Sequence, residues 1–296
     1  MFVVEINSGV SVNRMSAIPS NETLREWSES AQYWEKHAAT LRTIFAPVTR
    51  ALIQEAGISP GKNVLDVAAG AGEPSITIAE VVGPTGSVTC TDAIAEMVRA
   101  AESEARRRKL TNISFQQCTA DSLPFDDNSF DIVVSRLGVM FFPDPLAGLR
   151  EMLRVTRSNG ALALVVWDKS ESNPFLHIVS TVISRYVETP PADADAPGAF
   201  RFAERGKLAR ILSDAGAADV REHLLKFQIE ALISFPEFWE LRSETSATLR
   251  EKLATLSMED RLRAKQEVKE AARSFFRNGL MSFPAEMIIV TGRKPS

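Results

Sequence analysis

The sequence has few of the residues that build metal centres and disulfide frameworks. Its 296 residues include two cysteines, Cys90 and Cys118, and three histidines, with no Cys-x-x-Cys or His/Cys cluster. Structural zinc sites need such clusters, and small secreted domains need paired cysteines. We therefore expect no metal site and no disulfide. Two thiols buried in strands fit a reducing compartment, and we expect the cytoplasm.

Long apolar runs and an excess of positive charge are also missing. Nowhere do 18 apolar residues follow one another, so we expect no membrane-spanning helix. With 34 basic and 38 acidic residues the formal net charge is -4, which argues against a nucleic-acid partner. Residues 1–20 lack the basic region and apolar stretch of a secretion signal. We expect them to form an irregular extension, with Met15 as an alternative start.

The apolar residues change their period along the chain. At 45% hydrophobic and 24% charged, the composition is that of a globular protein. Helical spacing predominates from Thr23 to Ala56 and ends at Pro60-Gly61. From there to Trp167, short apolar runs alternate with helical segments, and turn residues separate them. This alternation predicts a parallel sheet covered by helices on both faces, a doubly wound, Rossmann-like α/β fold.

The predicted elements divide the chain into four parts. In the core we expect strands at 63–68, 87–91, 113–118, 130–135 and 161–167, and helices at 74–82, 94–110 and 145–155. Beyond it we expect helices at 174–187, 207–215 and 235–276, a strand at about 220–229, and a final antiparallel strand at 287–291. The parts are the extension 1–20, a helical arm or lid 21–60, a cofactor-binding core 61–168, and 169–296, which completes the sheet and carries a helical substrate cap (about 170–215 and 235–280).

A glycine-rich turn follows the first core strand. The segment VLDVAAGAGEP combines an apolar strand, a turn with Gly70 and Gly72, and Pro74 at a plausible first helical position. Glycines allow a sharp turn and a close approach of ligand. Asp92 ends the second strand, where a carboxylate can accept hydrogen bonds from both ribose hydroxyls, or can cap the helix that follows. The pattern predicts a nucleoside-containing cofactor.

The charge of this region separates two classes of cofactor. No Lys or Arg occurs between Asn63 and Arg99, whereas the acids there are Asp66, Glu73, Glu80, Asp92 and Glu96. Such a loop repels a pyrophosphate, and Ser75 stands where a dinucleotide fingerprint has its third glycine. S-adenosylmethionine has no phosphate and carries a sulfonium and an ammonium. The sequence favours this cofactor; a nicotinamide-dependent oxidoreductase and a binding protein that does not transfer methyl groups are the alternatives.

Five segments, in order, carry a family resemblance: VLDVAAGAGEPS, SVTCTDAIAEMV, ADSLPFDDNSFDIVVSR, GVMFFPDP and LREMLRVTRSNG. Between Lys62 and Trp167 the chain resembles class I S-adenosylmethionine-dependent methyltransferases, especially the ubiquinone/menaquinone C-methyltransferase branch. The resemblance implies a set of cofactor-binding residues that runs from the methionine end to the adenine and back to the reacting sulfur: Asp66, Ala68, Gly70, Gly72, Asp92, Ala93, Met97, Thr119, Ala120, Asp121, Ser135 and Arg136. Tyr33 would contact the cofactor from the arm.

Three positions depart from the family pattern. Ala68 replaces the first loop glycine, Thr119 replaces an aspartate, and Asn159 replaces a glycine before the fifth strand. Asparagine tolerates left-handed backbone geometry. With Thr119 in place, we expect the adenine amino group to be recognised by Asp121 or by the backbone.

The expected reaction is in-line transfer of the sulfonium methyl to a small molecule, which leaves S-adenosylhomocysteine. Candidates for a general base, needed only by a protonated acceptor, are His37, Asp168 and His177. An apolar or aromatic acceptor, or equally the packing of the cap, would explain the aromatic residues Phe141, Phe142, Phe175, Phe235, Phe238 and Trp239. The expected partner is this acceptor, and a homodimer is kept as an alternative to a monomer.

Overall fold

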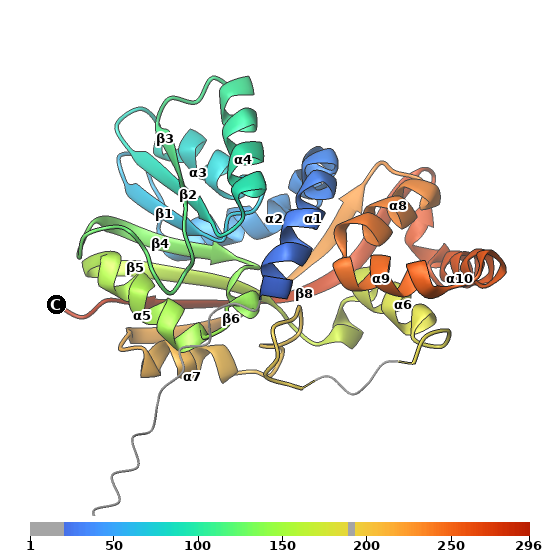
Figure 1. Cartoon of the computed structure of the whole chain (residues 1–296). Coiled ribbons are helices and arrows are strands. Elements are labelled where there is room, and N and C mark those ends of the chain that lie inside the picture. Colours follow the sequence, from blue (N-terminus) through green and yellow to red (C-terminus); the bar gives the residue numbers. More distant parts are fainter. Residues whose placement is uncertain (1–20, 189–192) are drawn as a thin grey trace, which may run out of the picture.

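The computed structural model describes residues 21–188 and 193–296; the extension expected at 1–20 lies outside them. One mixed sheet organises the described residues, with the strand order β3-β2-β1-β4-β5-β8-β6 and β7 beside β8 (Figure 1). Its strands are β1 (Asn63–Val67), β2 (Ser87–Asp92), β3 (Ile113–Gln117), β4 (Phe130–Arg136), β5 (Thr156–Trp167), β6 (Ala218–Ala231), β7 (Phe276–Arg277) and β8 (Leu280–Arg293).

The sheet has a parallel and an antiparallel part. Strands β1 to β5 pair in parallel, and β8 runs antiparallel to both β5 and β6. The predicted Rossmann-like class with an antiparallel final strand is therefore confirmed. Strand β5 begins five residues before the predicted start at Ala161, and Asn159 within it has a φ of 63°. Asparagine there takes the left-handed conformation that the sequence allowed.

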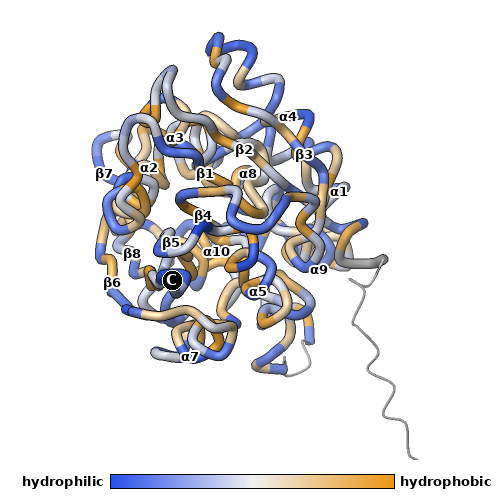
Figure 2. Tube along the Cα trace, turned by 90° about the vertical axis from the view of Figure 1, so that its left-hand side faces the viewer, coloured by the Kyte–Doolittle hydropathy of each residue, from blue (hydrophilic) through white to orange (hydrophobic). Residues whose placement is uncertain are grey.

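Helices cover both faces of the sheet. In Figure 1, α2 (Ala38–Ala56), α3 (Ser75–Val82) and α4 (Ala95–Arg107) lie on one side of it, and α5 (Pro145–Val155) and α7 (Lys207–Asp214) lie on the other. Figure 2 shows the apolar residues concentrated inside, with hydrophilic ones along outer helix faces such as that of α4. No helix in residues 21–188 and 193–296 combines the length and the apolar character that a membrane crossing requires.

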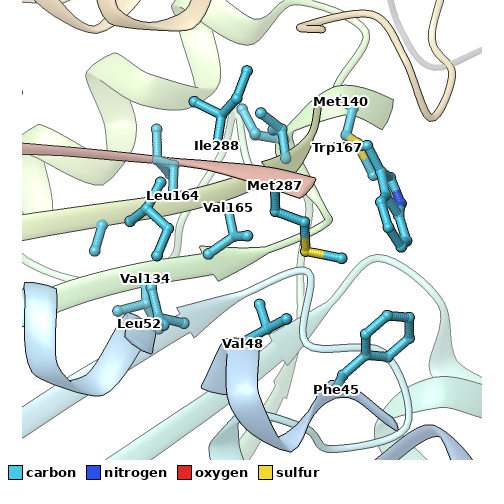
Figure 3. Packing of buried hydrophobic residues seen from close by; sticks show 14 of the residues in the cluster. Phe45, Val48, Leu52, Val134, Met140, Leu164, Val165, Trp167, Met287 and Ile288 are labelled. Carbon is cyan, nitrogen blue, oxygen red and sulfur yellow. The ribbon is translucent and has the colours of Figure 1, made fainter. Parts of the chain in front are cut away.

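The core between α2 and the sheet positions the first helices over the strand ends. Phe45, Val48 and Leu52, one helical face of α2, pack towards Val165 and Met287 (Figure 3). Val48 and Leu52 are fully buried, and each such side chain contributes about 1.5–3 kcal/mol through removal from water. The packing fixes α2, and with it Arg42 and Phe45, beside the carboxyl ends of the strands.

A group of helices from both ends of the chain covers that edge. It comprises α1 (Asn21–Lys36), α6 (Pro174–Ile183), α8 (Phe235–Thr245), α9 (Ala247–Thr255) and α10 (Met258–Ala271), gathered at one end of the sheet in Figure 1. The helical character predicted for 235–276 is confirmed, although the segment is divided into α8, α9 and α10. Ser246 and Ser257 interrupt it, because each side chain accepts a backbone hydrogen bond and starts a new helix.

Candidate cofactor and acceptor site

The turn after β1 has the backbone geometry that its glycines permit. The φ angles of Ala68, Gly70 and Gly72 are 59°, 57° and 107°, all in the left-handed region. Asp92, at the end of β2, holds this turn: its Oδ2 accepts from the Gly70 amide at 2.9 Å, and its Oδ1 accepts from the Ile94 amide at 3.0 Å. Burial raises the pKa of Asp92 above its usual range. The carboxylate therefore orders two loops and still lines the space between them.

That space is a cavity of about 190 Å³ at the carboxyl ends of the strands. Much of the cofactor set implied by the sequence lines it: Ala68, Gly70, Asp92, Ala93, Met97, Thr119, Ala120, Asp121 and Arg136. Cys118 lines it too. The expectation that both thiols are buried in strands is wrong for Cys118, which follows β3 and is partly buried. The cavity brings the ends of β1, β2 and β4 together at one site.

Four residues of the predicted set lie outside the cavity lining. Tyr33 packs against Arg250, whose guanidinium is 4.9 Å from the ring centroid. Gly72 allows α4 to approach, because a Cβ there would lie 3.1 Å from Ala101. Asp66 and Ser135 are fully buried behind the wall. These residues stand behind the surface that faces a ligand.

The carboxyl group of Asp66 is held by Ser75. Ser75 Oγ donates to its Oδ2 at 2.6 Å, and among the described residues its Oδ1 has no partner. Burial raises the pKa of Asp66 to about 7. The strand end thus contains a carboxyl group that titrates near neutrality.

Two arginines enter the cavity beside Glu73. Arg136 donates to Thr49 Oγ1 at 2.8 Å and to the carbonyl of Glu73 at 2.9 Å. Arg42 Nε lies 3.3 Å from Glu73 Oε1. In the described part of the chain, the Nε atoms of both arginines and Glu73 Oε1 are enclosed without a hydrogen-bond partner. The cavity therefore offers buried donors as well as acids.

Arg42 shows that the cavity is not lined by acids alone, as the charges of residues 63–99 had suggested. It comes from α2, and no local pattern marks it, because the charge count covered only neighbours in sequence. A phosphate-free zwitterion has both an ammonium and a carboxylate, and this lining has partners of both signs. The only sequence signal is that Arg42 precedes Phe45 by three residues and so shares the inward face of α2.

A second cavity of about 300 Å³ adjoins the first. The two share a wall of six apolar residues: Trp27, Trp34, Leu41, Phe45, Leu137 and Phe141. Beyond this wall it is lined by Met140, Trp167 and Phe175 from the core and by residues of α8 and α9. We call these the nucleoside cavity and the apolar cavity.

The three predicted general bases line neither cavity. His37 Nε2 is 2.7 Å from Glu244, and His177 Nδ1 is 3.0 Å from Ser170 Oγ. Asp168 is buried and pairs with Arg205 at 3.3 Å. The structure does not bring these side chains to the site, because each has a partner within the cap or at its base.

Of the six aromatic residues singled out in the sequence, three line a cavity and three only pack the cap. Phe141 lines both cavities, Phe142 the nucleoside cavity and Phe175 the apolar cavity. Phe235, Phe238 and Trp239 line neither. Phe238 is buried and packs on Phe175, with ring centroids 5.6 Å apart, so it supports the wall from behind.

Comparison with known proteins gives the class of this site. Residues 58–214 match the methyltransferase domain family. An uncharacterised protein of Mycobacterium tuberculosis is 34% identical over 178 residues, which are 60% of this chain and 62% of that protein. A demethylmenaquinone methyltransferase of Listeria welshimeri is 32% identical over 174 residues, 55% of this chain and 73% of the relative. The structure of Bacillus subtilis YcgJ aligns with a TM-score of 0.55 at 24% identity, over 84% of this chain and 98% of that one.

The chain belongs to the methyltransferase domain family, whose cofactor is S-adenosylmethionine, and it resembles the ubiquinone/menaquinone branch. The residues present fit that cofactor. The turn leaves open space at the Gly70 Cβ position, and a Cβ on Gly138 would lie 2.6 Å from Ala68, so Gly138 lets the loops after β1 and β4 approach each other at the cavity wall. Arg136 Nε and the ion-paired Arg42 Nε and Glu73 Oε1 are enclosed without a hydrogen bond and supply polar partners for a zwitterion.

Proposed function

We propose that this protein transfers the methyl group of S-adenosylmethionine to an apolar or aromatic small molecule. One observation carries the proposal: a cavity at the strand ends and a second cavity under the cap helices lie on either side of a shared wall of six apolar residues. A donor in one and an acceptor in the other would meet at that wall. The name of the Listeria relative, a demethylmenaquinone methyltransferase, supports a quinone-like ring as acceptor.

Within the nucleoside cavity, we assign the ribose hydroxyls to Asp92 and the adenine to the surroundings of Met97 and Asp121. The methionine end would lie at Ala68 and Gly70, with Arg42 and Arg136 as cations for its carboxylate. Asp66 and Ser135 act indirectly, since they stand behind the wall. The assignment places the reactive end of the cofactor next to the apolar cavity.

The bound cofactor supplies an electrophilic methyl on a good leaving group, so the chain mainly has to align the acceptor and exclude water. Trp27, Trp34 and Phe141 would do both, because they line both cavities and carry large apolar surfaces. Such alignment lowers a barrier by roughly 7–11 kcal/mol in favourable cases. None of the proposed base candidates reaches this wall, which favours an acceptor that reacts without a protein base.

A binding test comes first. Calorimetry and thermal unfolding with S-adenosylhomocysteine, in parallel with NADH, separate this proposal from an oxidoreductase. We expect saturable binding and a raised Tm with S-adenosylhomocysteine and no change with NADH; at 100 times Kd the stabilisation is about 2.7 kcal/mol. Binding of NADH alone would overturn the proposal.

Activity is tested separately. The protein is incubated with methyl-labelled S-adenosylmethionine and a panel of phenols, hydroquinones and aromatic acids, and label in the extracted products is counted. We expect label in at least one aromatic product. Cofactor binding without label in any product or in a cell extract would instead identify a binding protein.

A further inference from the structure

The apolar cavity contains an arginine without a partner. Among the residues that line it, two are charged, Glu26 on α1 and Arg242 in the last turn of α8. Throughout residues 21–188 and 193–296, Arg242 forms no ion pair or hydrogen bond, and its Nε is enclosed. Its only contact of note is with an aromatic face: the guanidinium carbon lies 5.1 Å from the Phe175 ring centroid.

Nearby arginines are different. Arg250 donates to Ser30 Oγ at 2.6 Å and to the carbonyl of Glu244, besides packing on Tyr33. Arg136, at the other cavity, has two hydrogen-bond acceptors. Arg250 and Arg136 thus have protein acceptors, whereas Arg242 lines a cavity of about 300 Å³ without one among the described residues.

The position is built and rigid. Phe175 under Arg242 is buried and packs edge-on against Phe238 and Phe283, with centroids 5.6 Å and 5.7 Å apart. The guanidinium therefore has a fixed platform. The helix dipole favours a cation in the last turn of α8. That effect does not explain why the Nε of this arginine is enclosed beside a cavity without an acceptor.

Arg242 is partly buried with its Nε enclosed, and burial without an anion is unfavourable for a guanidinium. Burial lowers the pKa of Arg242 to about 10, and no neighbouring carboxylate offsets it. The side chain still carries its charge at neutral pH. A buried cation is stabilised when an anion supplies the missing hydrogen bonds, so a ligand that brings an anion would complete this site.

We propose that the methyl acceptor is an aromatic or apolar carboxylic acid and that Arg242 binds its carboxylate while the wall residues hold its ring. This inference rests on the proposed function and names the substrate class of the same site. A carboxylate matches the two-pronged guanidinium geometry. A single cation with Glu26 on the same cavity suits a monoanion better than a phosphate dianion.

The test compares acids with their uncharged analogues. Benzoate, 4-hydroxybenzoate and 2-naphthoate are each titrated against the corresponding primary amide, with and without saturating S-adenosylhomocysteine. Amides keep the shape of the acid and remove its charge. We expect at least one acid to bind about 10- to 150-fold more tightly than its amide, the range that charge-assisted hydrogen bonds give. Equal binding of every pair, or no binding of any acid, overturns the inference.

Two variants test whether Arg242 causes the preference for acids over amides. We expect Arg242→Gln to reduce the acid-over-amide ratio to below about threefold while the Kd for S-adenosylhomocysteine stays unchanged. Arg263→Gln is the matched control, since Arg263 pairs with Glu259 on the exposed side of α10. An undiminished ratio in Arg242→Gln overturns the assignment; if that variant does not fold, the acid and amide titrations of the unaltered protein still decide.

The two proposals can fail separately. If acids are preferred but S-adenosylhomocysteine does not bind, the anion site stands and the methyltransferase proposal fails. If the cofactor binds and label is transferred only to uncharged acceptors, the anion site fails and the proposed function stands.

Discussion

Asp92 is the residue at which loop structure and ligand binding meet. Both of its oxygens accept backbone hydrogen bonds, from Gly70 and Ile94, and it also lines the nucleoside cavity. Each carboxylate oxygen has a further lone pair for a ribose hydroxyl. We expect Asp92→Ala to weaken S-adenosylhomocysteine binding by about 1.5–3 kcal/mol, as for charged hydrogen bonds, measured by calorimetry.

The control for Asp92→Ala is another carboxylate that serves only the sheet. Asp131 accepts from the Asn63 amide at 2.9 Å and lines neither cavity. Asp131→Ala should lower the Tm and leave the Kd for S-adenosylhomocysteine unchanged. Equal losses of affinity in both variants would show that Asp92 acts through loop order alone.

Asp66 makes stability depend on pH in a defined direction. Its pKa of about 7 in the fold lies above that of an unfolded aspartate, so between these values the folded chain holds a proton that the unfolded chain has lost. Stability contributed by this group is therefore greatest at low pH and is lost as the pH rises to about 7. Asp92 and Glu73, whose pKa values burial also raises, act in the same direction.

We expect Asp66→Asn to flatten that dependence. The difference in the free energy of unfolding between variant and parent should grow by at most about 2.7 kcal/mol from pH 5 to pH 7 and then level off, because one pKa unit corresponds to about 1.36 kcal/mol. Urea unfolding across this range measures it. Parallel curves for the two proteins would mean that Asp66 has an ordinary pKa.

Residues whose role is local could be predicted from sequence, and residues placed by distant packing could not. Gly70 and Asp92 are defined by a strand, a turn and a spacing, all of which are short-range features. Arg42 and Arg242 reach their cavities on helices whose positions depend on contacts far along the chain. A charge count over neighbouring residues cannot include them.

At the scale of elements, α1 packs on α4 through Ala31 and Met97, and its last turn is tied to α8 and the start of α9. Trp34 Nε1 donates to the carbonyl of Thr245 at 3.2 Å. Lys36 and His37 both pair with Glu244, at 2.8 Å and 2.7 Å. These contacts help to keep Trp27 and Trp34 at the shared wall, and the polar ones at this end of α1 are with the carboxylates of Glu240 and Glu244 and one backbone carbonyl.

We expect Glu244→Ala to loosen this lid. Loss of the acceptor shared by Lys36 and His37 should raise the KM for the acceptor several-fold and speed protease cleavage near residue 37, since surface pairs contribute about 0.2–1 kcal/mol each. Glu267→Ala is the control: Glu267 pairs with Arg185 and Tyr186 between α10 and the end of α6, away from the wall. An effect of equal size in both variants would contradict a specific role for the α1 contact.

The limits of element prediction have local causes. The helix α5 was placed correctly at 145–155, because Pro145 starts it and Asp144 caps it. The break of 235–276 into three helices depends on serines that accept backbone hydrogen bonds, and serine alone is a weak signal. Strand β8 is longer than the predicted strand 287–291 because it pairs with β6 along its length. This pairing is a tertiary contact that the local sequence does not show.

At the scale of the molecule, the cap joins segments more than 200 residues apart. Trp34 and Thr245 are separated by 211 positions, so neither end of the chain completes the cavities by itself. The parallel part of the sheet follows from the alternation of strands and helices. No sequence period predicts that α1 contacts α8. The apolar cavity forms only where these two helices are in contact.

This arrangement predicts where a bound cofactor changes the dynamics of the protein. Trp27 and Trp34 on α1 line the nucleoside cavity, whereas α10 lines neither cavity. A ligand that contacts α1 must be released before α1 can open. Amide exchange in α1 should therefore slow by up to the factor 1 + [L]/Kd, about 100-fold at 100 times Kd. Hydrogen-exchange mass spectrometry with S-adenosylhomocysteine should show this slowing in α1 and in the turn at Gly70, and little change in α10. Equal protection of α10 would mean that the cofactor stabilises the fold as a whole, and unchanged exchange in α1 would separate the lid from cofactor binding.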